Sequence, residues 1–115
     1  MTLTLPRAAR LRRRREFLEV QQRGKRLYSG EVLVLALATG GARPRIEITV
    51  SSKVANAVGR NRVKRWVREA FRAVQAELPP VDLVVIARRG APEMGIDGVR
   101  RALAAARDVL MGPRT

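Results

Sequence analysis

Apolar residues recur along this chain with two periods, one typical of helices and one typical of strands. Spacings of three and four predict helices at residues 12–23, at 54–71 with an end before Pro79, and at 97–111 with Asp97 as the N-terminal cap. Short apolar or alternating runs predict strands at residues 25–28, 31–39, 44–52 and 81–88. The expected fold is therefore an α/β (α+β) two-layer sandwich, in which helices pack on one small mixed sheet.

Two of the predicted strands differ in their patterns. Residues 81–88 form a nearly continuous apolar run, as expected of a strand that is buried on both faces. Residues 44–52 alternate between apolar and polar side chains, as in a strand with one face toward the core. Because the glycine-rich turn at 40–42 lies between residues 31–39 and 44–52, we expect these two strands to form an antiparallel hairpin. The pattern leaves the strand order open.

The helix predicted at 54–71 has one apolar face and one cationic face. Its apolar stripe covers an arc of roughly 140° and consists of Val63, Trp66, Val67, Ala70, Phe71 and Val74. The opposite face, which we call the basic row, spans about 100° and consists of Asn61, Lys64, Arg65, Arg68 and Arg72. Arg60 lies at its border, whereas Arg62 lies off it, so the pattern leaves open whether Arg62 faces RNA or bonds to neighbouring backbone or to Glu69. We expect Trp66 to belong to the core and not to stack on a base.

A row of cations on a helix is either a solvated face or a binding surface for a polyanion. Solvated rows are normally balanced by acids four residues away, and here only Glu69 is available. Repulsion within the row costs a few tenths of a kcal/mol for each close pair, and a bound polyanion removes that cost. The pattern therefore favours a nucleic-acid surface.

The composition supports this interpretation. The chain has 115 residues, 46% of them apolar, which predicts one folded domain at 12–111 between a flexible basic arm at 1–11 and a tail at 112–115. Lys and Arg total 24 against 10 acids, a net charge of +14, which attracts phosphate polyanions. Most of the cations are Arg, which favours forked contacts to phosphates. An anionic membrane is the rival partner, but the chain has no aromatic-rich amphipathic anchor.

Several absences narrow the function further. The sequence contains neither Cys nor His, which excludes disulfides, thiolate zinc sites and His-dependent catalysis. The longest apolar run, at 32–38, is too short to span a bilayer. The Arg-rich start is faintly similar to a transit peptide but lacks an apolar signal core, so we expect mature chain and a cytoplasmic location.

The stretch ITVSSKVANAVGRNRVKRWVREAFR, residues 48–72, resembles the signature of the protein subunit of bacterial ribonuclease P. That signature contains a strand ending in a Ser/Lys cluster, an Asn-Ala-Val turn, an Arg-Asn-Arg-x-Lys-Arg segment and an Arg-Glu-Ala-Phe close. An N-terminal Arg-rich segment with a Glu-Phe pair and a Pro-initiated apolar strand at 80–88 also fit. The resemblance covers about residues 11–110 and departs from the signature at Ser52, where the family has Lys.

The resemblance implies a fold and a function. The fold is α-β-β-β-α-β-α with a left-handed crossover through the basic helix. The function is to assist a large catalytic RNA in removing the 5′ leader from precursor tRNA, in a ribonucleoprotein of one RNA and one protein. The hydrolysis is assigned to Mg²⁺ bound by the RNA, and the protein is expected to hold no cofactor, no metal and no catalytic residue.

Two RNA-binding surfaces are also implied. The residues expected to contact the catalytic RNA are Ser52, Lys53, Asn56, Arg60, Asn61, Arg62, Lys64, Arg65, Arg68 and Arg72. The residues expected to line a leader-binding cleft between the first helix and the sheet are Arg10, Arg12, Arg13, Arg14, Phe17, Gln21 and Leu35. Aromatic residues are only 3% of this chain, and Gln21 and Leu35 stand where relatives carry Phe and Tyr, so the cleft should depend mainly on its arginines. Phe17 as a helix anchor in the core is the alternative to a stacking role.

Two other classes of function stay open at this stage. The composition fits a small basic ribosomal protein or RNA chaperone equally well. Only the ordered set of motifs argues against that class. A metal-dependent nuclease acting alone needs converging carboxylates, whereas Asp82, Asp97 and Asp108 are scattered along the chain.

Overall fold

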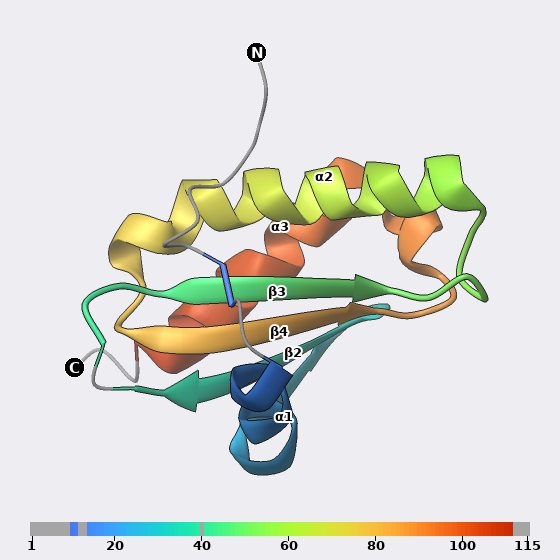
Figure 1. Cartoon of the computed structure of the whole chain (residues 1–115). Helices are drawn as coiled ribbons and strands as arrows, with labels where there is room; N and C mark the ends of the chain where they lie inside the picture. Colours follow the sequence, from blue (N-terminus) through green and yellow to red (C-terminus); the bar gives the residue numbers. More distant parts are fainter. Residues whose placement is uncertain (1–9, 12–13, 40, 112–115) are drawn as a thin grey trace.

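Three helices and four strands follow one another in the order that the resemblance implies. The computed structural model describes residues 10–11, 14–39 and 41–111 (Figure 1). The elements are α1 (Arg14–Arg23), β1 (Lys25–Ser29), β2 (Val32–Ala38), β3 (Arg45–Val50), α2 (Ala57–Val74), a 3₁₀ turn (Gln75–Glu77), β4 (Val81–Ala87) and α3 (Ala91–Leu110). The predicted α-β-β-β-α-β-α order is thus confirmed, and the left-handed crossover stays a prediction.

The strands form one mixed sheet in the order β1-β2-β4-β3. β1 and β2 are antiparallel neighbours joined by a tight turn, in which Gly30 has a φ of 58° that glycine adopts without a Cβ clash. β4 pairs antiparallel with β2 and parallel with β3. The sheet therefore has β1 and β3 as its two edges.

The predicted hairpin between the second and third strands is wrong. β4 lies between β2 and β3, and the hairpin is formed by β1 and β2 instead. The physical reason is burial. β2 and β4 carry near-continuous apolar runs that need cover on both faces, so they occupy the centre, whereas the alternating β3 suits an edge. The turn between β2 and β3 reverses the chain without pairing the two strands.

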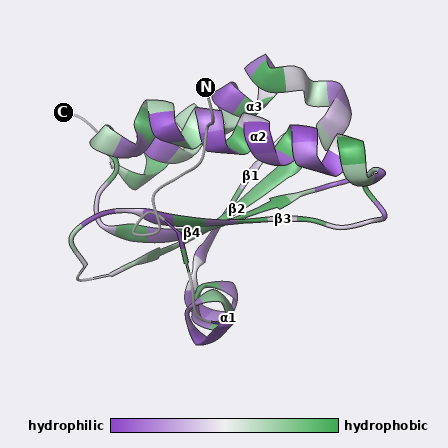
Figure 2. Cartoon of the chain, turned by 45° about the horizontal axis from the view of Figure 1, so that its top comes forward, coloured by the Kyte–Doolittle hydropathy of each residue, from purple (hydrophilic) through white to green (hydrophobic). Residues whose placement is uncertain are grey.

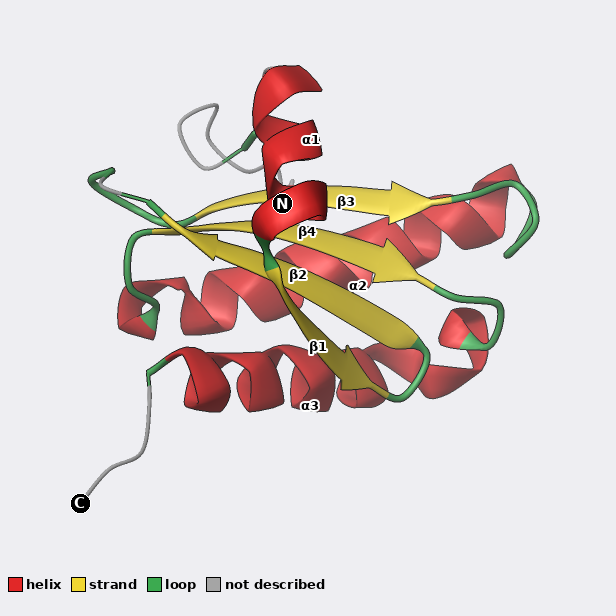
Figure 3. Cartoon of the chain, turned by 90° about the horizontal axis from the view of Figure 1, so that it is seen from below, coloured by secondary structure: helices red, strands yellow, loops and turns green. Residues whose placement is uncertain are grey.

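The helices divide between the two faces of the sheet. α2 and α3 lie side by side on one face, and α1 lies alone on the other (Figures 1 and 3). The main core fills the space beneath α2 and α3, and Val63, Val67 and Phe71 of the predicted stripe are completely buried in it. Trp66 is half-buried and packs against the same core, as predicted. In Figure 2 the central strand β2 is largely hydrophobic, while α2 carries bands of hydrophilic residues.

A smaller cluster holds α1 against the opposite face of the sheet. This α1 cluster consists of Leu11, Val20, Leu33, Leu35 and Val84, with Phe17, Leu37 and Ile86 packed on it. Leu11 reaches the cluster because the backbone of residues 10–11 runs beside β3, where the Leu11 N–H donates to the carbonyl of Ile46 at 3.2 Å. The last two residues of the predicted arm thus pair with the sheet. The rest of the arm and the tail at 112–115 lie outside the described residues.

The third helix begins six residues earlier than predicted. Gly90 precedes its first residue, Ala91, and Pro92 is tolerated in the first turn because no helical N–H is needed there. Gly95 interrupts the helix with a φ of 67° and a ψ of 177°. Asp97 lies just beyond this kink and pairs with Arg100 at 3.7 Å. Because the helix begins at Ala91, the predicted start at Asp97 is wrong.

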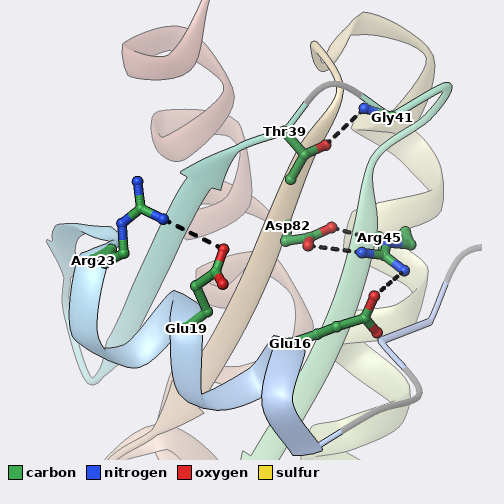
Figure 4. A network of polar contacts seen from close by, with 7 residues as sticks. All are labelled: Glu16, Glu19, Arg23, Thr39, Gly41, Arg45 and Asp82. Carbon is green, nitrogen blue, oxygen red and sulfur yellow. Dashed lines mark hydrogen bonds and ion pairs between the residues drawn. The ribbon is translucent and has the colours of Figure 1, made fainter.

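One polar network joins α1, β3 and β4 (Figure 4). Asp82 of β4 is only 5% exposed, and Arg45 of β3 donates to both of its carboxylate oxygens, at 2.9 and 2.8 Å. The third guanidinium nitrogen of Arg45 lies 2.9 Å from a carboxylate oxygen of Glu16 in α1. A single guanidinium therefore satisfies a buried carboxylate and holds α1 to the sheet.

Replacing Arg45 with Ala should lower the free energy of unfolding by about 3 kcal/mol, because it leaves the buried Asp82 without its cation. Urea denaturation measures the change. Arg23→Ala is the matched control, since Arg23 pairs with Glu19 at 3.5 Å on the exposed side of α1 and its loss should cost no more than about 0.5 kcal/mol. Equal losses in the two variants would contradict the structural role of Arg45.

Candidate nucleic-acid interface

A short turn and a capped helix end present the first predicted RNA-binding residues. Ser52 and Lys53 are exposed in the turn between β3 and α2, which the Val54 N–H closes by donating to the carbonyl of Ser51 at 3.0 Å. Asn56 is the N-cap of α2, and its side-chain oxygen accepts from the N–H of Gly59 at 2.9 Å. The sequence analysis missed this cap. The Asn56 amide still has its two N–H donors for a ligand.

The basic row lies on the side of α2 that is turned away from the core. Asn61, Arg65 and Arg72 are exposed, and Lys64 and Arg68 are half-buried toward β3. Within the described part of the chain, no cation of α2 forms an ion pair, and Glu69 pairs with none of them. The structure thus keeps a set of cations together, and no described acid forms an ion pair with any of them.

Arg60 and Arg62 lie on different sides of the helix. The Arg60 guanidinium donates to the carbonyl of Ala55 at 2.9 Å, so it holds the turn that leads into α2. Arg62 is exposed, and its side chain makes no hydrogen bond or ion pair with any described residue. The backbone bond considered for Arg62 is thus made by Arg60, and Arg62 keeps all its donors for another molecule.

A groove lies between α2 and the edge of β3. This β3 groove has a volume of about 150 Å³ and is lined by Arg10, Ile46, Glu47, Ile48, Lys64 and Arg68. Arg10 comes from the predicted leader-binding set, and Lys64 and Arg68 come from the predicted catalytic-RNA set. The fold therefore brings residues of the two predicted surfaces into one site, which the sequence analysis did not foresee. It also missed Glu47.

Glu47 is the acid of the β3 groove, and its carboxyl group is half-buried. Burial raises the pKa of Glu47 above its ordinary value, although Lys64, Arg10 and Arg68 each act to lower it. The loss of hydration thus outweighs the attraction of the three cations.

Three of the predicted leader-binding residues, Arg14, Phe17 and Gln21, lie on α1. Arg14 is exposed, and Phe17 and Gln21 are half-buried. Phe17 packs partly on the α1 cluster, so its ring serves as an anchor and keeps one part accessible. Leu35 is only 1% exposed within the α1 cluster, so its predicted place in the lining of a cleft is wrong. Arg12 and Arg13 lie outside the described residues.

The carboxylates considered for a nuclease do not converge. Asp82 is bound by Arg45, whereas Asp97 and Asp108 lie on α3 and pair with Arg100 and Arg107. Among the residues that the structure describes, no three His, Cys, Asp or Glu side chains come together to hold a metal ion. None of the described helices combines the length and the apolar character that a membrane crossing requires.

A second hollow of about 210 Å³ lies between β1 and α3. Its lining is mainly apolar and includes Leu27, Ala102, Ala106 and Val109, with Arg26 as its one charged residue. The β3 groove therefore has three cations in its lining, whereas this larger hollow has one.

Comparisons with known proteins agree with this arrangement. The family model described as ribonuclease P matches residues 5–110. The ribonuclease P protein component of Desulfovibrio desulfuricans is 45% identical over 101 residues, which cover 85% of this chain and 78% of the relative. That of Gluconacetobacter diazotrophicus is 48% identical over 87 residues, covering 73% of this chain and 75% of the relative.

Solved structures give the same result. The RNase P protein from Thermotoga maritima matches with a TM-score of 0.75 at 35% identity, over 92% of this chain and 98% of that protein. The RNase P protein of Staphylococcus aureus matches with a TM-score of 0.78 at 28% identity, over 86% and 92%.

Replacing Glu47 with Gln should stabilise the fold at neutral pH. Because the pKa of Glu47 is raised above 4.5, the folded protein retains a proton that the unfolded chain loses in the interval between 4.5 and the raised value. Stability of the unchanged protein therefore falls as the pH rises through that interval. We expect Glu47→Gln to have the higher Tm at pH 7, with a difference that shrinks as the pH approaches 4.5. A pH-independent difference in thermal melting would contradict the assignment.

Proposed function

This chain belongs to the ribonuclease P protein family, and from that premise we propose that it binds both the catalytic RNA of the enzyme and the 5′ leader of precursor tRNA. As a protein component of ribonuclease P, it acts in tRNA processing within a ribonucleoprotein. We propose a complex of one RNA and one protein in the cytoplasm. The role of the protein is to bind and position the two RNAs.

The observation that carries the proposal is the row of unpaired cations along α2. An Arg guanidinium donates to two phosphate oxygens in a fixed plane, so several arginines on one helix face can bind neighbouring phosphates. Arg65 and Arg72 offer such forks in full exposure. The half-buried Arg68 and Lys64 extend the basic surface toward the sheet. Asn61 adds a donor and an acceptor for bases or ribose.

The surface around α1 suits a single-stranded leader. Phe17 presents part of its ring beside the exposed Arg14, so a base can stack while its phosphate meets a cation. The α1 cluster and the Arg45 network fix the helix that carries both residues. We therefore assign leader binding to Arg14, Phe17 and Gln21, together with Arg10 at the edge of β3.

Hydrolysis itself is assigned to the RNA. Magnesium ions bound there would activate the attacking water and stabilise the leaving oxygen. The residues of this chain bind phosphates, orient the leader and reduce repulsion between the two RNAs. No carboxylate group of the described chain is assigned a catalytic role in this proposal.

Replacing Arg65 and Arg68 with Ala should weaken binding to the catalytic RNA and make it less sensitive to salt. The slope of log K against log salt should fall by roughly one unit for each phosphate that the variant no longer binds. Filter binding or fluorescence titration over a salt series measures it. Arg100→Ala removes one charge from α3 and is the matched control, for which the slope should not change. An unchanged slope in the α2 variant would mean that these side chains face solvent in the complex.

Reconstitution with the catalytic RNA from the same source tests the whole proposal. At low magnesium, the protein should promote cleavage of precursor tRNA, and the holoenzyme should bind precursor more tightly than mature tRNA. Phe17→Ala should reduce the affinity for precursor by about 1–3 kcal/mol, the value of one base–aromatic stacking interaction, and affect mature tRNA less.

Phe17→Leu separates stacking from packing, because it keeps an apolar anchor on the α1 cluster and removes the ring. An equal loss of affinity for precursor and mature tRNA would make Phe17 a packing residue. RNA binding without any effect on cleavage would favour a ribosomal protein or an RNA chaperone instead.

A further inference from the structure

The β3 groove is formed by segments that are far apart in the sequence. Arg10 is fixed beside β3 because the neighbouring Leu11 is buried and donates its N–H to Ile46. Lys64 and Arg68 reach the same groove from consecutive turns of α2. Three cations therefore surround a space of about 150 Å³, whereas a single water needs about 10–15 Å³. A phosphate group and accompanying waters fit this volume.

Glu47 faces these cations from the edge strand. The charged groups that act on it are Arg10 from the N-terminal segment and Lys64 and Arg68 from α2. Its neighbour across the ladder on β4 is the apolar Val84. The Glu47 side chain forms no ion pair or hydrogen bond with any described residue, so its carboxylate is not committed to a structural contact.

We propose that the β3 groove binds one phosphate group of RNA between Arg10, Lys64 and Arg68, and that Glu47 takes up a proton as the phosphate enters. The inference rests on the proposed function and goes further, because it assigns a phosphate site and a linked proton at the junction of the two RNA surfaces. The proton comes from solvent, and no covalent bond is formed or broken.

The physical reason for the proton is the closeness of two anions. A carboxylate and a phosphate in one half-buried groove repel each other, and the penalty is greater there than in open water. A protonated carboxyl group removes the repulsion and donates its O–H to a phosphate oxygen. Burial already raises the pKa of Glu47 before RNA binds, so the proton is taken up closer to neutral pH than for an exposed Glu.

Binding that takes up one proton must weaken as the pH rises. Over the interval in which Glu47 is ionised in the free protein and protonated in the complex, the affinity falls by up to about tenfold for each pH unit. Glu47→Gln mimics the protonated form and is free of this dependence. The ratio of the two affinities therefore isolates Glu47 from every group that titrates on the RNA.

The experiment measures the affinity of the full chain for the catalytic RNA between about pH 5.5 and about pH 8 at fixed salt. We expect Glu47→Gln to bind more tightly at the upper end by at least about threefold, and the advantage over the unchanged protein to disappear toward the lower end. Glu69→Gln removes an acid from α2 outside the groove and reports the effect of net charge alone. Circular dichroism of each variant verifies the fold.

The inference would be overturned if the affinity of Glu47→Gln, divided by that of the unchanged protein, stayed constant with pH. It would also be overturned if Glu69→Gln gave the same ratio at every pH. Either result would leave RNA binding itself intact, so the proposed function would stand. If the unchanged protein fails to bind the catalytic RNA at every pH, the proposed function fails and the inference fails with it. A double variant, Glu47→Gln with Lys64→Gln, should bind no more tightly than the unchanged protein, because the phosphate then lacks one of its cations.

Discussion

A buried carboxylate and the arginine that neutralises it determine how β3, β4 and α1 of this protein meet. Asp82 is the single charged side chain buried among the described residues. It lies opposite Arg45 in the parallel ladder, so the fork between them is possible only in this register of β3 against β4. The remaining nitrogen of Arg45 binds Glu16 and sets the position of α1. The register of β3 against β4 thus fixes the position of both the edge strand β3 and α1, the helix that carries Phe17.

The ion pairs of the protein also explain why the basic row is free to bind. The acids of the described chain that form ion pairs do so with arginines outside α2: Glu16 and Asp82 with Arg45, Glu19 with Arg23, Asp97 with Arg100, and Glu77 and Asp108 with Arg107. Few acids are left near the cations of α2. The cations of α2 therefore add their full charge to a chain whose net charge is +14, which attracts a polyanion to this face.

The helices and strands could be predicted from local periodicity, whereas the contacts between distant segments could not. The stripe from Val63 to Val74 repeats within one helix, so its burial follows from sequence spacing alone. The strand order depends on which strands need cover on both faces, and the turn at 40–42 suggested a hairpin that burial overrules. The first turns of α3 and the kink at Gly95 were missed because the helical spacing of apolar residues begins only at Val99. The β3 groove joins residues 10 and 64 through the tertiary fold, and no local pattern contains that information.

The edge of β3 is where the sheet, the two proposed RNA surfaces and the unpaired acid meet. An exposed edge strand is a template for unwanted pairing, and charged residues are one means of preventing it. Here the segment 10–11 covers part of the edge, and Lys64 and Arg68 crowd the remainder with positive charge. This charge opposes pairing with another copy of the chain, which carries the same cations, but attracts a polyanion. Glu47 lies in that field without a fixed partner, so its ionisation depends on what occupies the groove.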